Sequence, residues 1–292
     1  MSEPQTPLLV RVARKHTEAL DICSLDLVAE PGHTLPGFSA GAHIDVALPN
    51  GLVRQYSLCN PPGETGRYQI AVLRDAASRG GSQAVHEAVA EGSTLHISAP
   101  KNHFPLATDA AHHLLLAGGI GITPLLAMAE RLTSQGECFE LHHCTRSRDR
   151  TPFLERVAAS AFARQTHHHF DDGEAVQKLD IAATLQRAPA GTHLYVCGPQ
   201  GFMDGADHRK GLSPIYNFYS RCSADDPPMP PAFEDAQLIV RPLFTTAFLC
   251  ADFLQAQSCF GARRIVNGRD RAKMIAAKAQ IFDAAIRLAL VV

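Results

Sequence analysis

The chain has 292 residues, of which 46% are hydrophobic and 19% charged, and its formal net charge is −2. These values predict a globular protein of two or three domains and give no sign of a nucleic-acid or anionic-membrane partner. The first five residues lack the basic and apolar regions of a signal peptide, and no uncharged apolar run is long enough to cross a bilayer. Eight cysteines are scattered through the chain, so we expect reduced thiols and a cytoplasmic protein.

Residues 8–105 contain short apolar runs separated by glycine and proline turns, which predicts an antiparallel barrel or sandwich. Pro49, Asn50 and Gly51 have the chemistry of a hairpin turn. The predicted strands cover residues 8–12, 23–27, 43–48, 54–58, 68–73 and 94–97.

The strand at 54–58 carries Arg54 and Tyr56, which its two-residue period places on one face. A guanidinium can bind a phosphate through forked hydrogen bonds, and a tyrosine ring offers a flat apolar surface to a flavin. The alternative is a surface arginine beside a half-buried tyrosine. Spacing alone favours that alternative.

A second place for an anion precedes a helical run at 83–89. Two glycines leave backbone amides open, an arginine adds positive charge, and Ser82 is the predicted N-cap. The alternative is an ordinary capped helix after a flexible loop. The residues that would line this anion site are Arg74, Arg79, Gly80, Gly81 and Ser82.

The stretch 114–124 combines a buried strand, a glycine turn and a helix start. Thr123 is the predicted N-cap, and Pro124 is a first-turn proline. Open amides at such a helix start favour an anionic group such as a nucleotide phosphate, and the alternative is an ordinary strand-to-helix turn. The glycines of this turn are Gly118, Gly119 and Gly121.

Beyond residue 105 strands alternate with helices, which predicts a parallel sheet with helices on its faces. Ligands of such sheets lie beyond the carboxyl ends of the strands, where Thr145 and Arg146 would meet the ribose or adenine end of a nucleotide. Cys197 ends another strand, a position where cysteine is usually a small buried apolar residue. The predicted elements are strands at 114–117, 138–144 and 193–197 and helices at 123–133 and 151–162.

Four motifs occur together and in order: RQYSL, RGGS, GGIGITP and CGP. With them the chain resembles the ferredoxin–NADP reductase superfamily, and within it the group of phthalate dioxygenase reductase and vanillate demethylase reductase. The resemblance covers roughly residues 8–204. It implies an FMN-binding six-stranded barrel at 1–105, an NAD(P)H-binding α/β domain at 106–208, and a linker with a divergent region at 209–292.

The resemblance also implies roles for the residues of the first domain. FMN rather than FAD would be the flavin. Arg54 and the turn at 80–82 would hold its phosphate, and Tyr56 would pack on the isoalloxazine. Ser57, which precedes Leu58 in the same motif, would lie near the hydride-accepting nitrogen.

In the second domain the resemblance implies that Thr145 and Arg146 contact the adenosine of NAD(P)H. Cys197, with Gly198 and Pro199 after it, would lie beside the nicotinamide C4. Ser57 and Cys197 are therefore the predicted catalytic residues. The group usually prefers NADH, although the arginines of the 146–150 loop leave NADPH open.

Members of this group normally continue into a plant-type [2Fe–2S] domain with a Cys-x4-Cys-x2-Cys loop and a fourth cysteine. Residues 205–292 contain three cysteines, which are too few and wrongly spaced for that cluster. The region would be a different domain, a decayed one or a reading-frame artefact. Its features are Cys222, Cys250 and Cys259, a linker-like stretch at 225–231, aromatic residues at 216, 218 and 219, and an amphipathic pattern at 272–290.

Fifteen histidines include the runs 142–143 and 167–169. Adjacent residues of a strand point to opposite faces, so neither run forms an evident chelating set, and we predict no metal site. The expected function is a flavin-dependent NAD(P)H oxidoreductase that passes electrons from NADH through FMN to a one-electron acceptor, such as a ferredoxin or an oxygenase component. The alternative is a non-catalytic flavin- or nucleotide-binding remnant with a damaged tail.

Overall fold

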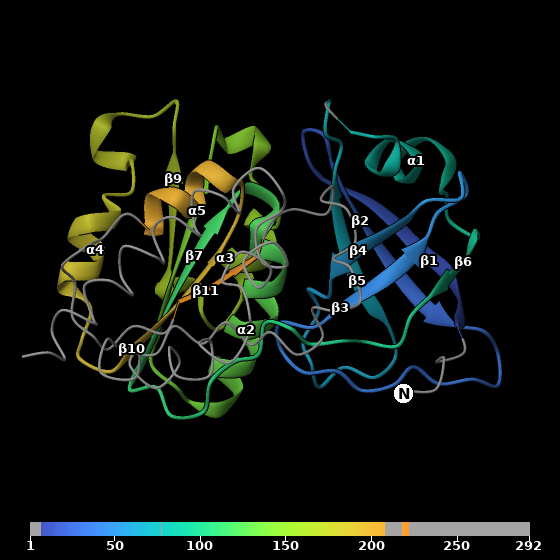
Figure 1. Ribbon diagram of the computed structural model, residues 1–292, viewed down its shortest axis with the longest axis horizontal. Coiled ribbons are helices and arrows are strands. Elements are labelled where there is room, and N and C mark those ends of the chain that lie inside the picture. Colours follow the sequence, from blue (N-terminus) through green and yellow to red (C-terminus); the bar gives the residue numbers. More distant parts are fainter. Residues whose placement is uncertain (1–6, 77, 208–217, 222–292) are drawn as a thin grey trace, which may run out of the picture. The chain divides into compact units, whose positions relative to one another are not determined.

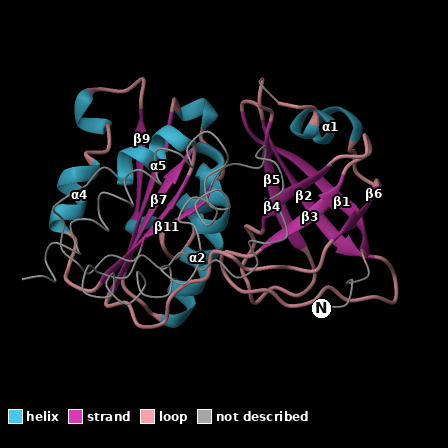
Figure 2. Ribbon diagram, in the orientation of Figure 1, coloured by secondary structure: helices cyan, strands magenta, loops and turns pink. Residues whose placement is uncertain are grey.

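A computed structural model describes residues 7–76, 78–207 and 218–221 of the chain (Figure 1). All of the described residues belong to the unit that ends at Pro228. This unit contains an antiparallel sheet followed by a parallel sheet with helices, which confirms the predicted fold class (Figure 2). The predicted linker at 225–231, the helix at 272–290 and the three tail cysteines lie outside the described residues.

The antiparallel sheet has six strands in the order β4-β3-β6-β1-β2-β5, with α1 inserted between β5 and β6 along the chain. Past the end of β4, the Cys59 amide donates a hydrogen bond to the Gln69 carbonyl of β5 at 2.9 Å. This bond joins the two edge strands, as a barrel requires. The elements are β1 Leu8–Ala19, β2 Ile22–Ala29, β3 His43–Ala47, β4 Val53–Ser57, β5 Tyr68–Leu73, α1 Gly81–Ala88 and β6 Thr94–Ile97.

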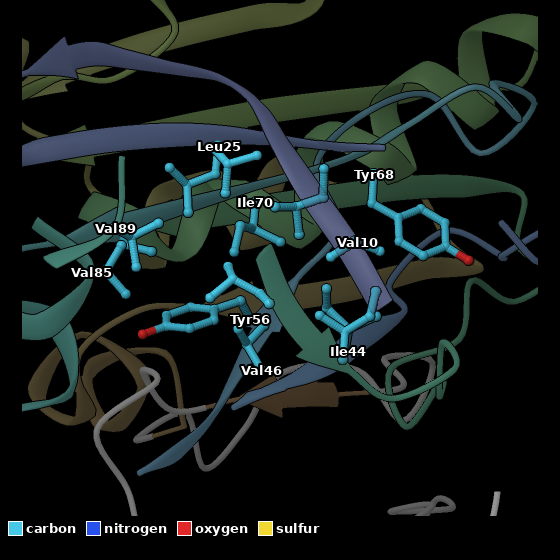
Figure 3. Packing of buried hydrophobic residues seen from close by; sticks show 14 of the residues in the cluster. Val10, Leu25, Ile44, Val46, Tyr56, Tyr68, Ile70, Val85 and Val89 are labelled. Atoms are coloured by element: carbon cyan, nitrogen blue, oxygen red, sulfur yellow. The ribbon is translucent and has the colours of Figure 1, made fainter. Parts of the chain in front are cut away.

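The core of this domain is formed by the inward residues of the strands together with Val85 and Val89 at α1 (Figure 3). Ile44 and Ile70 have no exposed surface, and fully burying such a side chain stabilises the fold by roughly 1.5–3 kcal/mol. Tyr68 lies at the margin of the core and donates its hydroxyl to the Pro36 carbonyl at 2.5 Å. The core therefore places α1 firmly over the strands.

The parallel sheet has five strands in the order β11-β10-β7-β8-β9. The chain runs from β7 outward to β9, then returns to β10 on the other side of β7, so the strand order reverses between β7 and β10. The strands are β7 His112–Gly118, β8 Phe139–Thr145, β9 Thr166–Phe170, β10 Thr192–Cys197 and β11 Phe218–Arg221. The α-helices are α2 Ile122–Gln135, α3 Leu154–Ala159, α4 Ile181–Arg187 and α5 Gln200–Asp207, and the short 3-10 turns are η1 Gly119–Gly121, η2 Arg148–Arg150, η3 Ala163–Gln165 and η4 Ala175–Gln177.

Alternate residues of the central strands face two different apolar clusters. Leu115 of β7 and Tyr195 of β10 pack with residues of α2 and α3. Their neighbours Leu114 and Leu194 pack on the other side, with residues of α4 and α5. The sheet is thus covered on both faces, as the apolar run of its central strand predicted.

The starts of three helices differ from the predictions. Gly121, not Thr123, is the N-cap of α2, and the Thr123 hydroxyl donates to the Ile120 carbonyl at 3.1 Å. Gly80, not Ser82, is the N-cap of α1. Its φ is +91°, a value that glycine adopts without strain. The predicted helix at 151–162 is confined to Leu154–Ala159, after Phe153 with φ +64°.

Several elements extend the predictions. β1 continues to Ala19 rather than ending at residue 12, and β9 contains the histidine run that no strand pattern indicated. β11 pairs in parallel with β10, so Phe218 and its neighbours supply a last strand of the sheet. Within the described part of the chain, no helix combines the length and the apolar character that a bilayer crossing needs.

His143 of β8 lies in the interior of the parallel domain with no exposed surface. Its Nε2 atom is 3.0 Å from the Gly119 carbonyl, which can only accept, so Nε2 carries the proton. Burial lowers the pKa of His143 from 6.5 to about 3. The folded protein therefore holds this ring neutral at pH values where the unfolded chain protonates it.

We predict that this residue makes folding depend on pH. Between about pH 7 and pH 5 the unfolded chain gains a proton on His143 and the folded chain does not, so the free energy of unfolding falls by about 2 kcal/mol from this residue. Urea denaturation at both pH values measures the loss. His143→Gln should lose that part of the pH dependence, whereas His33→Gln, at an exposed position, should keep it; equal pH dependence in all three proteins would contradict the prediction.

Candidate active site

The start of α1 brings together part of the first predicted site. A Cβ atom on Gly81 would lie 2.7 Å from Arg54 Nε, so the arginine side chain lies directly against the glycine backbone. Arg54 is 8% exposed. Its positive charge adds to that of the helix N-terminus, whose amides attract anions. The arrangement is suited to a phosphate group.

Two residues without a predicted role hold this turn and helix in place. Asn50 donates from Nδ2 to the Gly80 carbonyl at 2.9 Å. Lys15 Nζ donates to three carbonyls at the other end of α1, where a cation is favourable, and these are Val85 at 3.0 Å, His86 at 2.8 Å and Val89 at 2.6 Å. The turn chemistry of Asn50 was recognisable from the sequence, but not its contact with Gly80.

The remaining residues of the predicted anion site are placed differently. Arg74 forms an ion pair with Glu87 at 2.5 Å, near the C-terminal end of α1, so it does not join Arg54 and Gly81. Arg79 is exposed just before the helix. Ser82 is buried, and its Oγ accepts a hydrogen bond from the Asp75 amide at 3.2 Å.

The other residues of β4 and its end are packed into the barrel. Tyr56 lies among the apolar core residues (Figure 3). It is 3% exposed. Ser57 is half-buried at the end of β4, opposite His43 of β3. Leu58 is fully buried, and its amide donates to the Ala42 carbonyl at 2.9 Å. The flavin contacts expected of these residues stay predictions.

The second site is built where the order of the parallel strands reverses. Cys197 of β10 is in register with Ala117 of β7. A Cβ on Gly121 would lie 2.1 Å from the Cys197 carbonyl oxygen, and a Cβ on Gly198 would lie 2.9 Å from Gly118 Cα. The two turns therefore touch through their backbones, and a crevice at such a switch point is where open α/β sheets bind ligands.

Side chains around the switch point fix its shape. A Cβ on Gly118 would lie 3.0 Å from Pro199 Cδ and from the Phe202 ring. Gly119 has φ +55°, and its carbonyl accepts the bond from His143 described above. His143 was missed in the sequence, because a histidine inside a strand gives no sign of which backbone atom it reaches. Cys197 is 6% exposed at the strand end.

The two residues predicted to contact the nucleotide at the end of β8, Thr145 and Arg146, have different surroundings. The Thr145 hydroxyl is 2.6 Å from that of Thr151 and is buried, so it fastens the loop. Arg146 is exposed beyond the strand end. Arg150 pairs with Asp21 of the β1–β2 turn at 3.2 Å. Arg146 therefore has the exposure that an adenosine contact requires, and Arg150 is engaged elsewhere.

The two sheets adjoin through a single apolar cluster. Ala40, Cys59 and Ala71 of the antiparallel domain belong to the cluster that also contains Cys197. Arg156 of α3 adds a hydrogen bond from Nη1 to Gln69 Oε1 of β5 at 2.9 Å. Cys59, just beyond β4, and Cys197, at the switch point of the parallel sheet, thus belong to the same cluster.

The chain is similar in sequence to curated proteins and in fold to solved structures. A family described as "Protein of unknown function (DUF2855)" matches residues 187–272, which lie mostly outside the described part of the chain. A vanillate O-demethylase oxidoreductase of Pseudomonas putida is 56% identical over 192 residues, which are 66% of this chain and 60% of that protein. A heme-dependent oxidative N-demethylase beta subunit of Ectopseudomonas mendocina is 38% identical and is covered to 72%.

The chain spans about 60% of the length of the first curated relatives that it matches. The solved structure of phthalate dioxygenase reductase, described as modular for electron transfer from pyridine nucleotides to [2Fe–2S], is 38% identical with a TM-score of 0.67. That similarity covers 73% of this chain and 68% of the solved one. The chain therefore belongs to the phthalate dioxygenase reductase and vanillate O-demethylase oxidoreductase group of the ferredoxin reductase-type family.

Proposed function

We propose that the chain is an FMN-dependent NADH oxidoreductase that supplies electrons to a one-electron acceptor, as the reductase component of an aromatic-ring oxygenase or demethylase system. The observation that carries the proposal is a pair of glycine-lined sites. One lies at Gly81 beside Arg54, and the other lies at Gly121 against Cys197. They belong to domains that share one apolar cluster.

The residues around α1 fit the phosphate of FMN. Any side chain on Gly81 would collide with Arg54, so glycine keeps the backbone amides accessible beside the guanidinium. One arginine with one helix start is suited to a single terminal phosphate. Lys15 stabilises α1 from its other end and so fixes the helix that presents these amides. FMN, when bound, accepts two electrons as a hydride and releases them one at a time.

The residues around the switch point fit a dinucleotide. The start of α2 offers amides to the pyrophosphate, Arg146 is exposed for the adenosine end, and Cys197 borders the junction with the flavin domain. Arg150 is paired with Asp21, which leaves fewer cations for a 2′-phosphate and favours NADH over NADPH. The contribution of the protein to hydride transfer is orientation and charge placement.

The names of the relatives support an oxygenase or demethylase partner. They include vanillate O-demethylase oxidoreductases and the reductase subunit of a tert-butanol monooxygenase. The acceptor is proposed to be an iron–sulfur centre, either in a ferredoxin or in the oxygenase component. The [2Fe–2S] cluster implied by the family has no cysteine motif in residues 205–292.

The visible spectrum of the purified full chain, recorded before and after anaerobic NADH, tests the proposal. We expect flavin bands that bleach with NADH, FMN in the acid extract, and NADH oxidation with an artificial one-electron acceptor. Iron and sulfide assays report on a cluster. Flavin that stays oxidised would identify a binding protein, and a chain that takes up no FMN would refute the assignment.

We predict that Arg54→Ala weakens FMN retention. The substitution removes a charged hydrogen bond to phosphate, worth about 1.5–3 kcal/mol, and should raise the Kd for FMN by roughly 10- to 150-fold. Fluorescence titration of the apoprotein measures it. Arg74→Ala is the matched control, because its guanidinium pairs with Glu87; the assignment fails if both variants bind FMN like the unchanged protein.

We predict that Gly121→Ala impairs NADH use and leaves FMN binding intact. Its Cβ would lie 2.1 Å from the Cys197 carbonyl oxygen, so the two turns must separate, at a typical cost of about 1–3 kcal/mol. The KM for NADH should rise about tenfold or more. Gly201→Ala is the control, since a Cβ there meets nothing within 4 Å. Equal KM values for NADH in both variants would contradict the proposal that NADH binds at these turns.

A further inference from the structure

The outer edge of the parallel sheet gathers side chains that the proposed function does not use. In the β8–β9 register His142 lies opposite His167, and Cys144 lies opposite His169. The His142 ring stacks with both, with ring centroids 4.9 Å from His167 and 5.3 Å from His169. Glu140, two residues earlier on β8, is on the same face of the sheet.

A chain of hydrogen bonds fixes the tautomers of two of these rings. His169 Nδ1 is 3.0 Å from the Gln177 carbonyl, which only accepts, so Nδ1 is the donor. His169 Nε2 is then the acceptor for His142 Nδ1 at 3.0 Å. In this arrangement His142 Nδ1 donates to His169, and the other ring nitrogen, Nε2, points toward Glu140.

Two electron-pair donors thus face one another at the sheet surface. His142 Nε2 is 3.4 Å from Glu140 Oε2. Two donors bound to one tetrahedral zinc ion at about 2.0–2.1 Å lie about 3.4 Å apart. The separation is that of two ligands with a cation between them.

His167 supplies a third donor. One ligand atom from each of Glu140, His142 and His167 lies within 4.8 Å of the other two. We propose that these three residues bind a divalent transition-metal ion of the zinc class. His142 is buried, whereas Glu140 and His167 are exposed, so an ion can enter from solvent and keep a water in its fourth position. Two imidazoles and a carboxylate are a ligand set that Zn²⁺ accepts.

The site is separate from the cofactor sites. Its residues lie within β8 and β9, before the carboxyl end of β8 at Thr145. They also occupy the face opposite to that of His143. A bound ion would join the edge strand β9 to β8, so it would stabilise the sheet rather than take part in hydride transfer. His169 is a positioning residue, because it orients His142 through its other nitrogen.

Isothermal titration of the EDTA-treated full chain, without a histidine tag, with Zn²⁺ tests the site. We expect one site of micromolar or tighter Kd, a rise in melting temperature with Zn²⁺, and strong visible Co²⁺ bands typical of four-coordination. His167→Gln and Glu140→Gln should each weaken binding at least tenfold. His96→Gln, at an exposed strand position of the other sheet, should bind like the unchanged protein.

His169→Gln separates positioning from ligation. It keeps all three ligands and should weaken Zn²⁺ binding by about 10–100-fold, the range seen for partners of metal-bound histidines. Flavin content and NADH oxidation should be the same in all variants. Weak six-coordinate Co²⁺ bands, no saturable Zn²⁺ site, or equal Zn²⁺ affinity in His167→Gln and the unchanged protein would overturn the proposal.

Discussion

The proposed dinucleotide site depends on one constraint, which is the close approach of two backbone turns at the centre of the parallel sheet. The turn after β7 and the turn after β10 touch at Gly121 and Cys197, at a distance that leaves no room for a Cβ atom. This contact sets where α2 begins, and hence where its amides open toward a ligand. It also places Cys197 in the apolar cluster that includes Ala40, Cys59 and Ala71 of the antiparallel domain, so the turns border the junction of the two domains.

Two neighbouring buried histidines on β8 make contacts on opposite faces of the parallel sheet. His143 points to the α2 side and donates to the Gly119 carbonyl, which fixes the turn between β7 and α2. Its neighbour His142 points to the other side and faces Glu140. Both rings are kept neutral by burial, which lowers the pKa of each. The two neighbouring rings thus make a backbone contact on one face of the sheet and a side-chain contact on the other.

The pattern of neighbouring residues predicted the strands and glycine turns well, because a buried strand and a tight turn each depend on the types of consecutive residues. β5 and β6 have the predicted bounds. Local pattern failed at the helix starts, where Ser82 and Thr123 have good capping chemistry but follow glycine-built turns that already begin the helix. β9 was missed because three successive histidines show no apolar alternation.

Contacts between distant elements could not be predicted in the same way, because they depend on register. Asn50 reaches Gly80 and Arg150 reaches Asp21 only after the strands have paired. The histidine edge is the clearest case, since a shift of β9 by one residue would turn His167 and His169 to the other face. Beyond the strand ends, the Asp171 and Asp172 amides donate to the Thr145 and Arg146 carbonyls at 2.9 and 3.1 Å. These backbone bonds continue the pairing register past the histidines, so the loop that carries Arg146 is held in the same register as the histidines of β8 and β9.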